Sequence, residues 1–137
     1  MDRRVGYLVK RVQAALRNEM DRVLASEELT TPQYAAMSAL EREPGLSNAE
    51  LARRCFVTPQ TMIRIVEGLE DKGSLARTEH PTHGRILEAT LTTAGRKAVA
   101  ACHQRVAAVE HQMLRALSEA ERRSLADLLE RCAAALE

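Results

Sequence analysis

The strongest constraint on the fold is a pair of helix-start signals that lie only eleven residues apart in the middle of the chain. Ser47 is followed three residues later by a glutamate, which is the spacing of a capping box, in which the two side chains satisfy each other's backbone donors. The second signal is Thr58 with Pro59, because threonine caps helices and proline fits the first helical position. The first helix must therefore be short. The second is predicted to run to about Lys72, before Gly73 provides a left-handed C-cap.

Two further helices are predicted ahead of this pair. Residues 5–24 place apolar side chains three and four positions apart, which marks one face of a helix. The next helix is predicted to start at Thr31, whose side-chain oxygen would cap it ahead of Pro32, and to stop near Pro44.

Two more helices are predicted at the C-terminal end. Thr92 is placed to cap a long helix, and the pair Ser118 and Glu121 forms a second capping box that opens the last one. The last helix gathers apolar side chains on one side, at Leu125, Leu128, Leu129, Cys132 and Leu136. A helical stripe of about 20 residues spans about 30 Å, the diameter of a small domain. Because the compact centre cannot cover such stripes, we expect a second copy of the chain to cover them.

Between the central pair and the long helix, the pattern becomes extended. Residues 75–79 and 86–91 are strand candidates, and the turn-forming residues 80–85 separate them. The predicted fold class is mainly α with a small β-hairpin wing, arranged as a winged helix-turn-helix with N- and C-terminal dimerisation helices. A single domain is expected, divided into a DNA-binding core at 30–92 and dimerisation helices at 1–28 and 93–137.

The second helix of the central pair is the candidate DNA reader. In such modules this helix lies in the major groove, and its N-terminal residues face base edges. Its core side is predicted to hold Met62, Ile65, Val66 and Leu69. The side left for DNA holds Thr58, Gln60, Thr61, Ile63 and Arg64. Glutamine pairs well with adenine and arginine with guanine, and threonine bonds bases or touches a thymine methyl. Two interpretations stay open for Ile63: it packs against thymine methyl groups, or it packs on the wing.

Charge supports this placement by its position rather than its sum. The formal net charge is only +1. Residues 51–66, however, contain Arg53, Arg54 and Arg64 and no acidic residue, and a local basic stretch is the footprint of a nucleic-acid binder. Arg53 and Arg54 either contact phosphates or form a solvated helix face.

The order of elements, together with residues 47–52, 57–62, 68–73 and 91–95, resembles the multiple antibiotic resistance regulator (MarR) family. The resemblance covers nearly the whole chain. It implies a homodimer whose first and last two helices interlock, double-stranded palindromic DNA as the partner, and repression relieved by a small molecule or by oxidation. The ligand-binding residues are not identified.

The resemblance also implies a wing that enters the minor groove through Arg85. The family usually carries an aspartate two residues earlier, where this chain has His83, which we expect to contact phosphate or to cap the turn. Arg77, which matches the family's arginine at the end of the first wing strand, is consequently expected to lack its usual acidic partner.

The cysteines and histidines favour neither redox nor metal chemistry. Cys55, Cys102 and Cys132 fall where apolar residues are expected, and free cysteine often behaves as a small buried hydrophobe. The cysteines are odd in number and lack a CxxC spacing, which favours a reducing compartment and a cytoplasmic location. The four histidines form no tight cluster with other ligands, so no metal and no cofactor are expected.

An enzyme and a protein-interaction module are the two alternative classes of function. An enzyme is not expected, because no phosphate-binding loop, paired carboxylates or nucleophile motif is present. A protein-interaction module that kept this fold without binding DNA is compatible with the near-neutral net charge. The acid-free stretch at 51–66 speaks against that alternative. No membrane span is expected, since no apolar run reaches about 18 residues.

Overall fold

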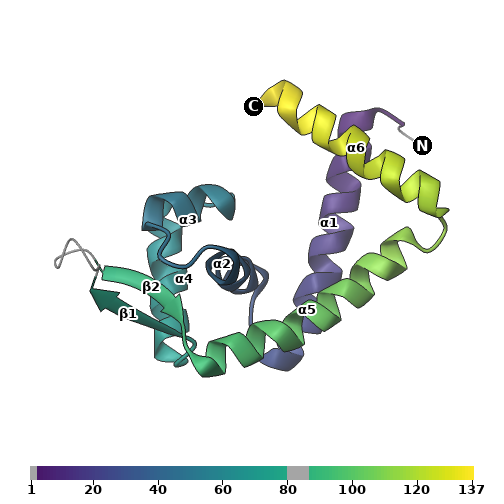
Figure 1. Cartoon of the computed structure of the whole chain (residues 1–137). Coiled ribbons are helices and arrows are strands. Elements are labelled where there is room, and N and C mark those ends of the chain that lie inside the picture. The colour runs from purple at the N-terminus through teal and green to yellow at the C-terminus, as the bar shows by residue number, and fades with distance from the viewer. Residues whose placement is uncertain (1–2, 80–86) are drawn as a thin grey trace.

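The computed structural model describes residues 3–79 and 87–137 and is mainly helical, with one antiparallel two-stranded hairpin (Figure 1). The predicted fold class, mainly α with a small β-hairpin, is confirmed. In chain order the elements are α1 (Val5–Leu24), a 3-10 turn η1 (Ala25–Glu27), α2 (Thr31–Arg42), α3 (Asn48–Arg54), α4 (Pro59–Asp71), β1 (Leu75–Glu79), β2 (Leu87–Leu91), α5 (Thr93–Leu114) and α6 (Glu119–Leu136). Among the residues described, no helix combines the length and apolar character needed to cross a membrane.

Figure 1 shows α2, α3, α4 and the hairpin gathered on one side of the molecule, and α1 and α6 on the other. Helix α5 runs from the hairpin towards α6. We call α2, α3, α4, β1 and β2 the lobe, and α1, α5 and α6 the arms. The core lies in the lobe and is closed by the end of α1 and the first half of α5. Its buried side chains are Leu24, Leu29, Ala36, Met37, Ala39, Leu40, Leu46, Leu51, Ala52, Met62, Val66, Leu69, Leu75, Val99 and Cys102.

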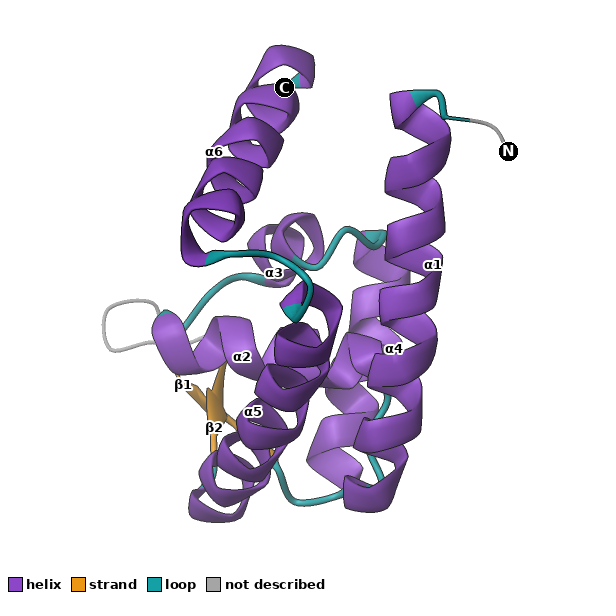
Figure 2. Ribbon diagram, turned by 90° about the vertical axis from the view of Figure 1, so that its right-hand side faces the viewer, coloured by secondary structure: helices purple, strands orange, loops and turns teal. Residues whose placement is uncertain are grey.

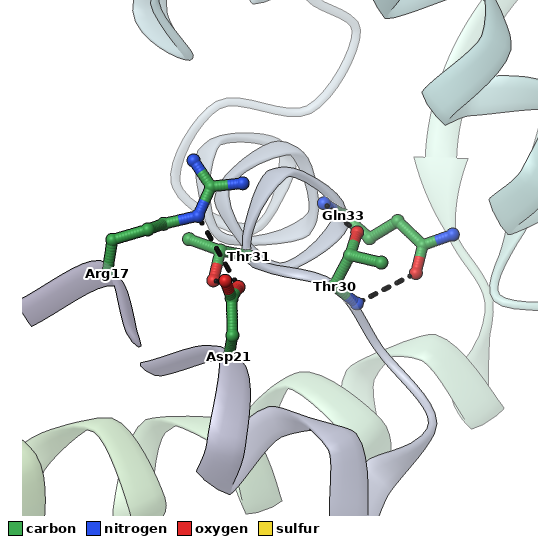
Figure 3. Close-up of polar contacts among 5 residues, drawn as sticks. All are labelled: Arg17, Asp21, Thr30, Thr31 and Gln33. Atoms are coloured by element: carbon green, nitrogen blue, oxygen red, sulfur yellow. Dashed lines mark hydrogen bonds and ion pairs between the residues drawn. The ribbon is translucent and has the colours of Figure 1, made fainter. Parts of the chain in front are cut away.

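Helix α2 begins at Thr31 as predicted, but its capping residue is one position earlier than predicted. Its cap is Thr30, whose hydroxyl accepts the backbone N–H of Gln33, while the Gln33 side chain accepts the backbone N–H of Thr30. Thr31 has another role: its hydroxyl donates to the carboxylate of Asp21, which also lies 3.4 Å from Arg17 (Figure 3). The hydrogen bond from Thr31 lowers the pKa of Asp21. This contact fastens the start of α2 to α1.

The other predicted caps are present, with one difference. Thr58 and Thr92 cap α4 and α5, and Ser118 forms the full capping box with Glu121. At α3 only half of the predicted box forms. The Ser47 hydroxyl accepts the backbone N–H of Glu50, but it donates its own proton to the Glu50 carboxylate, which therefore does not reach back to the backbone.

The hairpin is joined to both α4 and α5 by backbone contacts. Leu75 of β1 pairs with Leu91 of β2. The described strand β2 begins at Leu87, and the predicted strand residue before it lies outside the described residues. Gly73 has a φ of 75°, as a left-handed C-cap requires. At the start of α5, a Cβ on Gly95 would overlap the backbone carbonyl oxygen of Ser74, so the helix can approach the lobe this closely only with glycine.

The arms leave much of their apolar surface uncovered. Figure 2 shows α6 and the N-terminal half of α1 extending beyond the rest of the chain. None of the residues of α6 is buried. The large exposed apolar side chains of the arms are Val5, Tyr7, Val9, Val12, Met113, Leu128, Leu129 and Leu136.

The three cysteines differ in burial. Cys102 is fully buried, as predicted, and Cys55 is half-buried against the core. The prediction that Cys132 is a buried small hydrophobe is wrong for the single chain, where Cys132 is exposed. Cys132 is exposed because no part of its own chain covers the apolar face of α6. Burial raises the pKa of the Cys55 and Cys102 thiols.

Candidate nucleic-acid interface

Helix α4 separates its two faces as its sequence pattern predicts. Met62, Val66 and Leu69 are buried in the lobe core, and Ile65 is half-buried. The opposite face exposes Gln60, Thr61 and Arg64. In the described part of the chain, the Gln60 amide and the Arg64 guanidinium have no recorded hydrogen bond or ion pair, so both side chains are available to an external partner.

The first turn of α4 is held by its own threonines. The Thr58 hydroxyl accepts the backbone N–H of Thr61 at 3.1 Å and donates to the Thr61 hydroxyl at 3.0 Å. Its hydrogen-bonding capacity therefore serves the helix cap. The Thr61 hydroxyl accepts the bond from Thr58 and keeps its own O–H proton and its second lone pair for a ligand, while Thr58 offers mainly its methyl group.

Asn48 is a positioning residue that the sequence analysis missed. Its side-chain amide donates to the backbone carbonyl of Pro59 at 3.0 Å and so joins the first turn of α3 to the first turn of α4. This bond helps to set the angle between α3 and α4 within the lobe. No sequence signal identifies it, because an asparagine at the start of a helix is ordinary and its partner lies eleven residues away.

The two adjacent arginines of α3 are not equivalent. The Arg54 guanidinium donates to both carboxylate oxygens of Glu43, at 2.6 and 3.0 Å, and this hydrogen bonding raises the pKa of Arg54. Arg53 is exposed and has no ion pair recorded among the residues described. Among the described residues of this surface, Arg53 and Arg64 are therefore cations without an ion pair, whereas Arg54 already has a carboxylate partner.

Arg77 of the wing has an acidic partner that was not predicted from the sequence. The Arg77 side chain donates to the carboxylate of Glu70 at 2.7 Å, which ties β1 to the last turn of α4. The family's usual aspartate is replaced by His83, and a glutamate from the neighbouring helix pairs with Arg77 instead. His83 and Arg85 lie outside the described residues.

Ile63 borders a groove between α3, α4 and the hairpin. The groove has a volume of about 260 Å³. Its other lining residues are Leu46, Asn48, Leu51, Val66, Glu67, Arg77 and Ala89. The Ile63 side chain thus faces residues of the wing strands, yet remains 45% exposed. One side of Ile63 lies towards the wing and the rest is open, so packing on the wing and packing against thymine methyl groups both stay predictions.

A chain of hydrogen bonds links the lobe to α5 behind this surface. The Tyr34 hydroxyl lies 2.6 Å from Nδ1 of His103, and Nε2 of His103 lies 2.8 Å from the Glu41 carboxylate. Because the carboxylate only accepts, a neutral His103 carries its proton on Nε2, and its Nδ1 accepts the hydrogen bond that the Tyr34 hydroxyl donates. Burial raises the pKa of Tyr34. Within residues 3–79 and 87–137, no three His, Cys, Asp or Glu side chains converge to hold a metal ion.

Comparison with known proteins gives this arrangement its family. The sequence matches the MarR family over residues 28–86. The HTH-type transcriptional repressor Rv2887 of Mycobacterium tuberculosis is 39% identical over 130 residues, which cover 95% of this chain and 94% of Rv2887.

Crystal structures of M. tuberculosis Rv2887 have the same fold. The complex with salicylic acid has a TM-score of 0.80 at 39% identity, covering 96% of this chain and 97% of that one. The complex with DNA also has a TM-score of 0.80, at 37% identity over 96% and 98% of the two chains. A relative of this identity that spans almost all of both chains shows the family. This chain belongs to the MarR family of DNA-binding transcriptional regulators, with a winged helix-turn-helix fold.

Proposed function

We propose that this chain is a repressor that binds a palindromic operator as a homodimer and leaves it when a small molecule binds. The observation that carries the proposal is the divided surface of α4. One face completes the lobe core, while the other presents an amide and a guanidinium without partners in the described chain. A capped helix with this surface fits the major groove, where its first turns meet base edges.

The residues of this surface are assigned distinct roles. Gln60 makes paired hydrogen bonds to adenine and Arg64 to guanine, while the Thr58 methyl, Thr61 and Ile63 contact thymine methyl groups or base edges. Arg53 contacts phosphate. Arg54 does so only by exchanging Glu43 for a phosphate oxygen, so its contribution to affinity is smaller than that of Arg53. On the wing, Arg85 enters the minor groove and His83 contacts the backbone.

The homodimer is supported by the uncovered arms. The apolar faces of α1 and α6 are exposed, and an apolar groove of about 260 Å³ lies between α1 and α5. Its lining residues are Val12, Ala15, Leu16, Glu19, Val109, Gln112, Met113 and Arg115. A second copy of the chain supplies equally apolar arms to cover these surfaces. Two-fold dimers are the commonest assembly, and one would set two α4 helices about 34 Å apart, one turn of DNA.

Release by a small molecule is supported by the relative Rv2887, which has been crystallised with salicylic acid and with DNA. An effector changes DNA affinity only if it binds the DNA-bound and free forms differently. In this chain the Tyr34–His103–Glu41 hydrogen bonds connect the lobe to α5, so they help to set the angle between the reading helix and the arms. That angle determines the spacing of the two reading helices in a dimer.

The first test is selection of genomic fragments by the purified protein, followed by fluorescence anisotropy at two salt concentrations. A palindromic site bound by two chains, with affinity falling steeply as salt rises, is expected because neutralised phosphates release counterions. Salicylate added to the complex is expected to lower the anisotropy. Failure to enrich any sequence would contradict the proposal and favour a protein-interaction module.

Single substitutions test the assigned roles. Arg64→Ala is expected to weaken binding to the selected site by about 1–3 kcal/mol and to relax the preference at one base pair. Arg53→Ala is expected to weaken all sequences alike and to reduce the salt dependence. Lys97→Ala, which removes an exposed charge from α5, is the control and is expected to change neither affinity nor preference. If Arg64→Ala leaves both unchanged, α4 is not the reading helix in the way proposed.

A further inference from the structure

The turn between α3 and α4 contains an aromatic side chain in an unfavourable place. Phe56 has a φ of 57°, in the left-handed region, and its side chain is 93% exposed. Left-handed backbone is disfavoured for residues that carry a Cβ. A bulky apolar side chain in water adds a second disadvantage. Phe56 is the one phenylalanine of the sequence.

The local hydrogen bonds show which residue type this position prefers. The backbone N–H of Val57 donates to Ala52 at 3.1 Å, and that of Phe56 donates to Arg53 at 3.3 Å. This pair of bonds is a Schellman motif, whose left-handed position is usually glycine. Helix α4 ends in the same way, and there the left-handed residue is Gly73. The chain therefore has glycine at one of two equivalent helix ends and phenylalanine at the other.

Nothing in the described chain offsets this arrangement. The Phe56 ring has no recorded aromatic contact, and its exposure leaves little surface for packing. Residues held in unfavourable backbone conformations tend to lie at functional sites. A molecule outside this chain could supply the contacts that the Phe56 ring lacks within the described residues.

The position of the turn indicates what that molecule is. Phe56 lies two residues before Thr58, the cap of the reading helix, and within the acid-free residues 51–66. Phe56 thus lies in the turn that joins the helix exposing Arg53 to the helix exposing Gln60 and Arg64. A polyanion is favoured at this surface, and a duplex also offers apolar atoms to an aromatic ring, namely thymine methyl groups and deoxyribose carbons.

We propose that Phe56 is a further DNA contact of this protein, whose ring packs on the apolar edge of the duplex next to the first turn of α4. The left-handed turn then lowers the stability of the protein, while the ring that it holds out raises the affinity for DNA. This inference rests on the DNA-binding function proposed above.

The test is Phe56→Gly, measured in two ways on the full chain. The substitution relieves the left-handed strain and removes exposed apolar surface, so the midpoint of thermal unfolding is expected to rise. Affinity for the genomic fragment selected by the wild-type protein is expected to fall about tenfold, which corresponds to about 1.4 kcal/mol for loss of one partly buried aromatic contact. A purely structural role would move stability and affinity in the same direction.

Glu28→Gly is the matched control. Glu28 has a φ of 58°, is exposed and ends η1 with the same pair of backbone bonds, but it does not lie in the turn between α3 and α4. The Glu28→Gly variant is expected to gain stability as Phe56→Gly does, and its affinity for DNA is expected to be unchanged. Phe56→Tyr keeps the ring and is expected to bind DNA as the wild type does.

Three results would overturn the inference. Wild-type DNA affinity in Phe56→Gly would show that the ring does not contact DNA. A fall in its thermal midpoint would show that the turn is not strained. A loss of affinity in Glu28→Gly would show that the effect is not local. In each case Arg64→Ala still tests the reading helix by itself, whereas failure of the wild type to select any DNA would reject the proposed function.

The chemical nature of the contact is resolved by replacing thymine with deoxyuridine in the selected fragment. If this removes the affinity difference between wild type and Phe56→Gly, the ring packs on thymine methyl groups. If the difference persists, the ring packs on deoxyribose carbons.

Discussion

The lobe and the arms contain the same kinds of aliphatic side chain at the same helical spacing, but they differ in what covers them. In the lobe, Met62 and Leu69 of α4 are fully buried. In the arms, Leu128 of α6 is 52% exposed and Leu136 is 91% exposed. Helix α5 passes from a covered to an uncovered region: Val99 near its start is buried, and Met113 near its end is exposed. An apolar stripe therefore predicts which face of a helix is to be covered, and not whether its own chain covers it.

The largest effect is expected from charging the apolar face of α6. In a two-fold dimer, Leu128→Asp with Leu129→Asp changes four side chains, each about half-exposed in the single chain. Each contributes about half of the 1.5–3 kcal/mol of full burial, so association is expected to weaken by about 3–6 kcal/mol. Sedimentation equilibrium over a range of concentrations measures it. Ala134→Asp, on the opposite side of α6 by helical period, is the control and is expected to leave association unchanged. A wild-type chain that sediments as a monomer would contradict the expectation that a second copy covers the arms.

The next effect tests the claim that the lobe core is complete within one chain. Leu69→Ala in the monomeric α6 variant is expected to lower the free energy of unfolding by about 2–5 kcal/mol, because it leaves a cavity at a fully buried position. Leu136→Ala in the same background is expected to change it by less than about 0.5 kcal/mol. Urea unfolding measures both. Similar losses from the two variants would mean that α6 packs on its own lobe in solution.

A smaller effect is expected where the arm meets the lobe. Gly95→Ala places a Cβ against the Ser74 carbonyl, which is backbone and cannot rotate away, so a loss of about 1–3 kcal/mol is expected. Gly6→Ala in α1, where a Cβ meets nothing within 4 Å, is expected to stabilise its helix by about 0.5–1 kcal/mol. Thermal unfolding of the two variants compares them. Equal behaviour would show that α5 is not held tightly against the lobe.

The smallest perturbation is thiol labelling, which compares the two regions without changing the core. In the monomeric α6 variant, Cys132 is expected to react first, Cys55 later and Cys102 only on unfolding. Only the thiolate reacts, and burial raises the pKa of the Cys55 thiol, so the labelling rate of Cys55 is expected to keep increasing to higher pH than that of an ordinary free thiol. In the wild type, Cys132 is expected to be protected by the partner copy. Rapid labelling of Cys132 in a wild-type dimer would place α6 outside the interface.

Local features of the fold were predictable because they depend on neighbours in sequence. Thr58, Thr92 and Ser118 cap helices as expected, since a cap needs only a side-chain oxygen within three residues of an orphan N–H. The buried and exposed faces of α4 follow from helical period in the same way. Arg64 and Gln60 could thus be placed on the outer face from the sequence, whereas their contacts with bases stay predictions.

Contacts between elements were not predictable in this way. The partner of Arg77 is Glu70, the partner of Arg54 is Glu43, and Tyr34 meets His103 across 69 positions of sequence. Each of these depends on the distance between two packed elements, about which periodicity carries no information. The displaced cap at Thr30 has the same cause, because Thr31 is taken by Asp21 of α1.

The sequence by itself determined where helices begin and which of their faces are apolar, because caps and helical period depend on residues close together in the chain. The family resemblance was also available from the sequence alone. Only the tertiary structure decided that α6 is left uncovered, that Arg54 is paired while Arg53 is free, and that Phe56 is held in left-handed backbone with its ring in water. Those outcomes depend on how whole elements pack. Packing is decided by the sum of many contacts between residues distant in sequence.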